Sequence, residues 1–120
     1  MRPTTNERRE DLLREALEIM HAEHGTPLEL DDIARRIATS RRHLQRVFRE
    51  LHGEPFRTAL THIRLDRAAE LLAEPSPVKI REVARRVGYQ EPAQFAKAFR
   101  RRHGLVPSEY RERATASVSA

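Results

Sequence analysis

Apolar residues recur at helical spacing along most of the chain, and each run ends at a Gly, a Pro or a capping residue. This pattern predicts helices over about 7–23, 30–38, 41–51, 56–73, 80–87, 92–102 and 107–112. Asn6 is the expected N-cap of the first helix, and Ser40 that of the third. No alternating strand pattern competes, so we predict an all-α fold of about seven helices.

The second half of the chain repeats the apolar pattern of the first. At an offset of 50, the positions of Leu30, Ile33, Ala34 and Ile37 are matched by Ile80, Val83, Ala84 and Val87. At an offset of 51, the positions of Leu44, Phe48 and Gly53 are matched by Phe95, Phe99 and Gly104. Each repeat is a short helix, a tight turn and a longer helix, which together predict a helix-turn-helix.

The repeat also predicts how the chain is divided. Residues 1–52 should hold the N-terminal helix and the first helix-turn-helix, and residues 53–74 a long linker helix. Residues 75–113 should hold the second helix-turn-helix and a C-terminal helix. The small, polar residues 114–120 are expected to form a disordered tail.

Charge is divided unevenly along the chain. The net charge is +5 and the pI about 10.6, yet residues 1–32 hold four Arg against nine acids. Residues 33–113 hold 19 bases against nine acids, and 21 of the 23 bases in the chain are Arg. A basic body suggests an anionic partner, and Arg favours bidentate contacts with phosphate or guanine.

The third predicted helix combines a polar, basic face with an apolar one. Arg42, Gln45, Arg46 and Arg49 fall opposite the stripe that contains Leu44, Val47, Phe48 and Leu51. Arg can bridge guanine O6 and N7, and Gln can pair with adenine N6 and N7, so this face suits a DNA major groove. A solvated cationic face on a helical bundle would look the same, and it is the rest of the chain that favours DNA.

Other classes of function have little support. The chain has no Cys, no apolar run long enough to span a membrane and no signal-peptide pattern, so we expect a cytoplasmic protein. His21 and His24 could share a helix face, but no third ligand has matching spacing. Motifs for nucleophiles, phosphate loops or paired carboxylates are missing, so we predict no enzyme, no metal and no cofactor.

Several segments carry a more specific signal. They are LDDIA at 30–34, HLQRVF at 43–48, GEPF at 53–56, RLDRAAELL at 64–72, IREVARRVGY at 80–89, FAKAFR at 95–100 and GLVPSEYR at 104–111. With these motifs, residues 28–113 resemble the DNA-binding domain of the AraC/XylS family of bacterial transcription regulators. Because only 27 residues precede the matched segment, the chain is similar to the stand-alone MarA, SoxS and Rob-like activators, or to a domain of a longer protein.

The resemblance implies where DNA would be bound. The helices near 41–51 and 92–102 would enter adjacent major-groove segments, with the helix over 56–73 holding them apart. In the first helix-turn-helix the implied DNA-binding residues are Ser40, Arg41, Arg42, His43, Gln45, Arg46 and Arg49. In the second they are Gln90, Ala93, Gln94, Ala96, Lys97 and Arg100. Candidate phosphate contacts, which ion pairing with Asp31, Asp32 or Glu82 could equally explain, are Arg35, Arg36, Arg85 and Arg86.

The two implied recognition helices differ in chemistry. Ala93 and Ala96 cannot hydrogen-bond to bases and could touch only thymine methyl groups. We therefore expect the first half to supply most of the sequence specificity, and the second mainly position and affinity. The chain also departs from the family pattern, with Ala38 where Gly is usual and with Glu29 and Lys79 where Ser or Thr caps are favoured.

The predicted function is a sequence-specific, double-stranded DNA-binding transcription regulator, an activator that binds DNA as a monomer and contacts RNA polymerase. It would act in the bacterial cytoplasm, at the nucleoid when bound. The alternative is a protein-interaction adaptor that binds RNA polymerase or another regulator without reading DNA. Double-stranded RNA is a weaker candidate, because its deep, narrow major groove excludes such helices.

Overall fold

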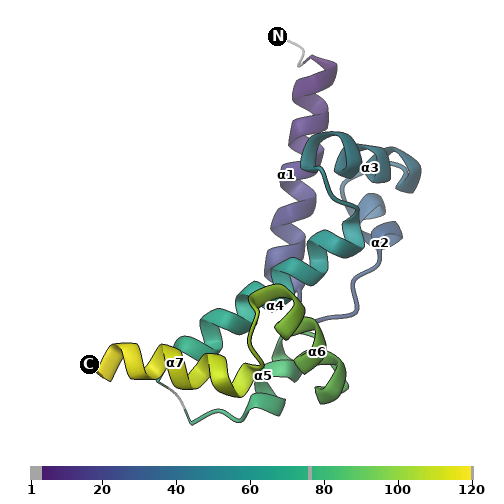
Figure 1. Cartoon of the computed structure of the whole chain (residues 1–120). Coiled ribbons are helices and arrows are strands. Elements are labelled where there is room, and N and C mark those ends of the chain that lie inside the picture. Colours follow the sequence, from purple (N-terminus) through teal and green to yellow (C-terminus); the bar gives the residue numbers. More distant parts are fainter. Residues whose placement is uncertain (1–3, 76, 120) are drawn as a thin grey trace. The chain divides into compact units, whose positions relative to one another are not determined.

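The computed structural model describes residues 4–75 and 77–119, with side chains up to 116. All regular elements in these residues are helices, which confirms the predicted all-α fold (Figure 1). The α-helices are α1 (Thr5–Glu23), α2 (Leu30–Arg36), α3 (Arg41–Val47), α4 (Phe56–Ala73), α5 (Ile80–Arg86), α6 (Pro92–His103) and α7 (Pro107–Ser119). A π-helical turn, η1 (Phe48–His52), continues α3.

The chain forms two compact units, Met1–Thr61 and His62–Ala120, each of which contains one helix-turn-helix. We call them unit 1 and unit 2. The boundary falls inside α4, so the first residues of this helix belong to unit 1 and the remainder to unit 2. Among the described residues no helix is long and apolar enough to cross a membrane.

In unit 1, helix α1 packs a narrow apolar stripe against the helix-turn-helix. Leu12, Ala16 and Met20 recur every four residues, and all three are buried. The helix begins two residues earlier than we predicted. Thr4 is its N-cap: the Thr4 hydroxyl accepts a hydrogen bond from Glu7 N at 3.1 Å, and Thr4 N donates to the Glu7 carboxylate at 3.2 Å. Asn6 lies inside the helix, because this reciprocal capping box satisfies two N–H groups at once.

The turn of each helix-turn-helix has the same hydrogen bonds. In unit 1, Thr39 N donates to Ala34 O at 2.9 Å and Ala38 N to Arg35 O at 3.2 Å, which together form a Schellman motif. In unit 2 the corresponding N–H groups of residues 89 and 88 donate at 2.9 and 3.1 Å. The motif needs a left-handed residue after the helix. Gly88 (φ 102°) provides it in unit 2, whereas Ala38 takes it at φ 58° in unit 1.

Helix α3 packs its apolar residues into the core of unit 1, but its last turn is a π-turn rather than an α-turn. Leu44, Val47 and Phe48 are buried. Gly53 N then donates to Phe48 O at 3.0 Å, the i→i+5 bond of a π-turn. Because a π-turn is wider than an α-turn, the next apolar residue leaves the stripe: Leu51 is 39% exposed. Our prediction that Leu51 faces the core is therefore wrong.

Unit 2 has a core built on aromatic rings. Phe95 and Phe99 of α6 are fully buried, as their inward spacing predicts, with ring centroids 5.7 Å apart. Tyr110 of α7 meets Phe99 edge-on at 5.3 Å, so α7 is held against α6. The buried members of this core are Leu65, Ala68, Ala69, Leu72, Val83, Ala84, Val87, Phe95 and Phe99.

The C-terminal helix is longer than we expected. We predicted a disordered tail over 114–120, but α7 continues to Ser119, and residue 120 lies outside the described residues. Once a helix has nucleated, each further residue adds a hydrogen bond at little cost, and the Ala residues at 114 and 116 are strong helix formers. Composition alone therefore misled the prediction.

Candidate nucleic-acid interface

Helix α3 presents one face to the core of unit 1 and the opposite face to solvent. Ser40 caps its first turn, with Oγ accepting a hydrogen bond from His43 N at 3.0 Å. Because its apolar side chains fix the rotation of the helix, the outward-facing side chains form one exposed row along it. This row, which we call the α3 row, consists of Arg42, Gln45, Arg46 and Arg49.

Residues that the structure describes do not neutralise the cations of the α3 row. Arg42, Arg46 and Arg49 make no ion pair with any residue that the structure describes. The acid that follows them, Glu50, is instead bound by Arg9 of α1. Paired in this way, the Glu50 carboxylate cannot fold back onto the row. Three guanidinium groups therefore remain available to an anionic partner.

The other residues predicted in the first helix-turn-helix lie at the start of α3. The Arg41 side chain is exposed, and its Nε lies 3.4 Å from the Asp31 carboxylate of α2. His43 is partly buried. Pairs between two exposed side chains contribute at most about 1 kcal/mol, so Asp31 would restrain Arg41 only weakly.

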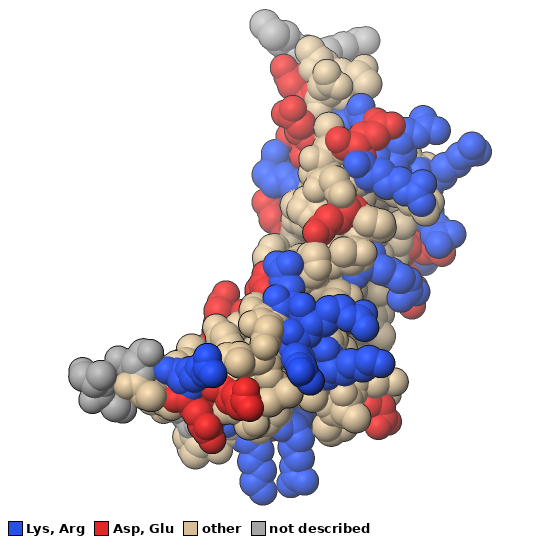
Figure 2. Space-filling view, in the orientation of Figure 1, with Lys and Arg blue, Asp and Glu red and all other residues tan. Residues whose placement is uncertain are grey.

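Helix α6 has the same two-sided construction in unit 2. Burial of Phe95 and Phe99 turns Gln94, Lys97 and Arg100 toward solvent. Gln90 and Ala93 are also exposed, whereas Ala96 is partly buried. Figure 2 shows Lys and Arg side chains clustered over α3 and, separately, over α6.

An ion-pair cluster fixes the C-terminal end of α6 against α4 within unit 2. Arg102 donates two hydrogen bonds to the Asp66 carboxylate, at 3.1 and 2.9 Å, and His103 Nε2 lies 3.4 Å from the same group. The hydrogen bond from Arg102, with further help from its charge and that of His103, lowers the pKa of Asp66 despite partial burial. Asp66 therefore positions α6.

The four candidate phosphate contacts on the short helices are all ion-paired. Arg35 lies 2.6 Å from the Asp32 carboxylate, and Glu82 accepts hydrogen bonds from both Arg85 (2.5 and 3.0 Å) and Arg86 (3.3 Å). Arg36 binds Glu23 of α1 at 2.9 and 2.5 Å.

These pairs change the charge that the short helices offer. The hydrogen bond from Arg36 lowers the pKa of Glu23, and the hydrogen bond from Arg85 lowers that of Glu82. Ion pairing, one of our two interpretations of these arginines, is therefore what the structure contains. In unit 1, acids among the described residues therefore neutralise less of the positive charge of the α3 row than of the two arginines of α2.

Sequence reasoning missed the ion pairs that position the two exposed faces. Arg9 and Glu50 are 41 residues apart, and Asp66 and Arg102 are 36 apart. Such long-range pairs leave no periodic signal in a single sequence. By contrast, the absence of a side-chain cap hydrogen bond at Glu29 and Lys79 agrees with our expectation from their chemistry.

Comparison with known proteins shows which family has this arrangement of helices. A family model described as a helix-turn-helix domain matches residues 33–113. A solved AraC-type regulator structure from Chromobacterium violaceum is 30% identical with a TM-score of 0.83, covering 88% of this chain and 93% of that one. The chain belongs to the AraC family of helix-turn-helix transcription regulators. The proteins of this family are DNA-binding regulators rather than enzymes.

Two further relatives refine the AraC-family assignment. The DNA-binding domain of AdpA, solved in complex with a target DNA, is 31% identical with a TM-score of 0.79, covering 88% of this chain and 94% of that one. The regulator GlxA of Rhizobium meliloti (strain 1021) is 39% identical over 97 residues, which are 81% of this chain but 30% of that protein. The chain spans about a third of the length of the curated relatives that it matches.

Proposed function

We propose that this AraC-family chain binds specific sequences in double-stranded DNA by inserting α3 and α6 into adjacent segments of the major groove. The observation that carries the proposal is the α3 row, an exposed strip of one Gln and three Arg that make no ion pair with a described residue, on a helix whose other face is buried. These are the side chains best suited to guanine and adenine edges. A solved structure of a relative with its target DNA supports the same use of the domain.

We propose further that the two recognition helices contribute unequally. Arg46 and Gln45 of α3 can make bidentate hydrogen bonds to bases. On α6, the exposed Ala93 and the partly buried Ala96 offer only methyl groups, and Lys97 and Arg100 are suited to phosphates. Unit 1 would then select the sequence, while unit 2 would add affinity that depends strongly on salt.

The remaining parts of the proposal concern how the chain acts in the cell. Because each chain carries two helix-turn-helix units, one chain can cover two groove segments and would bind as a monomer. Its similarity to the lactose operon transcription activator of Staphylococcus xylosus favours activation. We propose RNA polymerase as a partner, in the bacterial cytoplasm. A reporter gene behind a selected site would distinguish activation from repression.

The test is selection of bound sites from a random DNA pool, followed by binding measurements on the selected site. Arg46→Ala should cost about 1–3 kcal/mol and relax preference at one base position. Lys97→Ala should weaken binding to all sequences alike and reduce the salt slope by about one.

Arg14→Ala is the matched control, because it removes one exposed Arg from the acidic helix α1. It should leave both affinity and preference unchanged. If the pool yields no enriched sequence, or if Arg46→Ala behaves like this control, DNA reading by α3 is wrong. The adaptor that does not read DNA would then be the better interpretation.

A further inference from the structure

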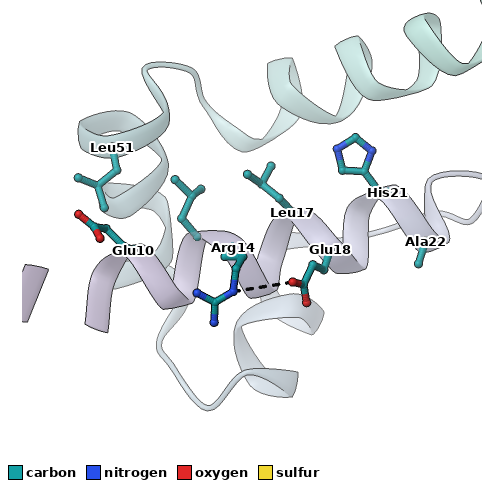
Figure 3. A pocket seen from close by; sticks show the side chains of 8 residues that line it. Glu10, Arg14, Leu17, Glu18, His21, Ala22 and Leu51 are labelled. Atoms are coloured by element: carbon teal, nitrogen blue, oxygen red, sulfur yellow. Dashed lines mark ion pairs between the residues drawn. The ribbon is translucent and has the colours of Figure 1, made fainter. Parts of the chain in front are cut away.

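Helix α1 carries more apolar surface than unit 1 buries. Its stripe of Leu12, Ala16 and Met20 lies in the core, but Leu13 and Leu17 lie at the edge of that stripe and stay partly exposed. Together with Leu51 of η1 they line an open groove of about 790 Å³ (Figure 3). The whole groove lies within unit 1, between residues 10 and 51.

Leu51 is the large apolar side chain that is most exposed among the described residues. The π-turn of η1 rotates it out of the core and onto this groove. At the equivalent position of the second repeat the chain has Arg102, a charged residue that binds Asp66. An exposed Leu where the other repeat carries a charge is not explained by the fold, and π-turns are frequent at functional sites.

The rim of the groove is acidic. Glu10 and Glu18 are both exposed, and Glu10 makes no ion pair with any described residue. Arg14, the cation between them, lies 2.7 Å from Asp11 and 3.8 Å from Glu18 (Figure 3), so three acids face one cation here and the net charge stays negative. A DNA backbone would be repelled by this rim, whereas a cationic partner would be attracted to it.

We propose that this groove, which we call the α1 groove, binds an amphipathic helix of a partner protein, with apolar side chains against Leu13, Leu17 and Leu51 and with Lys or Arg beside Glu10 and Glu18. Residues 10 and 18 are about 12 Å apart along α1 at 1.5 Å per residue, so about two turns of a partner helix would span them. Docking of a helix through apolar anchors at i, i+3 and i+7 is a common mode of recognition. The α1 groove and the α3 row have no residue in common.

The test uses a fluorescein-labelled synthetic helical peptide of about 15 residues, the length at which isolated helices become stable. It carries Leu at i, i+3, i+7 and i+10 and Lys on both flanks, and its binding to the full chain is measured by fluorescence anisotropy. Leu51→Ala and Glu10→Lys should each weaken binding about tenfold, a factor that corresponds to about 1.4 kcal/mol. Glu109→Lys, an exposed acid of α7 changed in the same way, is the matched control and should leave binding unchanged.

Two further peptides separate the apolar and charged contributions. Replacing every Leu by Gln keeps the charge, and replacing every Lys by Glu keeps the apolar stripe; both should bind at least about tenfold more weakly. DNA binding by the Leu51→Ala chain should equal that of the wild type, which shows that the variant is folded. Equal binding by all three peptides, an equal effect of Glu109→Lys, or self-association of the chain that Leu51→Ala abolishes would each overturn the proposal; the last would make the groove an interface between copies.

Discussion

Ala38→Gly should stabilise unit 1, although it replaces a good helix former by the most flexible residue. Ala38 occupies the left-handed position of a Schellman motif at φ 58°, where Gly88 stands in the second repeat. An L-residue pays about 1–2 kcal/mol for this conformation, since its Cβ approaches the following carbonyl. Gly avoids that cost, and both hydrogen bonds of the turn remain.

The gain is reduced by the unfolded state. Gly has more conformations to lose on folding than Ala, which costs about 0.4–1 kcal/mol. The difference leaves a net stabilisation of about 0.5–1 kcal/mol. For a unit of about 60 residues, this corresponds to a rise in Tm of roughly 2–8 °C.

Urea unfolding followed by far-ultraviolet circular dichroism measures the change, and amide hydrogen exchange locates it in residues 4–61. Gly53→Ala is the matched control in the same unit. Gly53 has φ 79°, and a Cβ added there would meet nothing within 4 Å, so only backbone strain should act. It should destabilise unit 1 by about 0.5–1 kcal/mol, the cost of the left-handed conformation less the gain from a less flexible unfolded chain. Destabilisation by Ala38→Gly, or no effect of Gly53→Ala, would refute the reasoning.

Three other changes follow from the packing and ion pairs. Phe99→Ala should destabilise unit 2 by about 3–5 kcal/mol in urea unfolding, because it empties the centre of the aromatic core; a loss below 1 kcal/mol would contradict that packing. The hydrogen bond from Arg102 lowers the pKa of Asp66, so the Asp66 carboxylate stabilises unit 2 fully above the ordinary carboxyl pKa of about 4, and this stabilisation is lost as pH falls through the lowered pKa. Asp66→Asn should therefore make the urea unfolding midpoint less sensitive to pH below about 4. An unchanged pH profile would contradict this. Arg9→Ala should weaken DNA binding by about two- to fivefold because it frees Glu50 beside the α3 row, whereas Arg9→Ala combined with Glu50→Gln should restore it.

Periodicity was sufficient for the helices and for most of the core. The inward stripe of α6 placed Phe95 and Phe99 correctly, because a helix can bury only residues that recur every three or four positions. The repeat located both turns, including the odd Ala38. Choosing between capping residues was harder: Thr4 and Asn6 can both cap, and only the reciprocal bond with Glu7 decides.

What a single sequence could not supply depends on contacts between distant residues. The π-turn that exposes Leu51 leaves the spacing of apolar residues unchanged, so the pattern predicted a buried residue. The pairing of Arg9 with Glu50, which leaves the α3 row free of acids, joins elements 41 residues apart. For the same reason the sequence could predict which residues form the candidate DNA-binding face, but it could not predict which of its charges are paired with acids.

The most direct test of the central claim is a hydroxyl-radical footprint combined with saturation mutagenesis of a site selected from random DNA. If one chain places α3 and α6 in neighbouring major-groove segments, two patches about 10 base pairs apart should be protected on one face of the duplex. Base substitutions should cost about 1–3 kcal/mol in the patch read by α3, and less in the other. A single protected patch, or equal sensitivity to base substitution in both, would contradict the account.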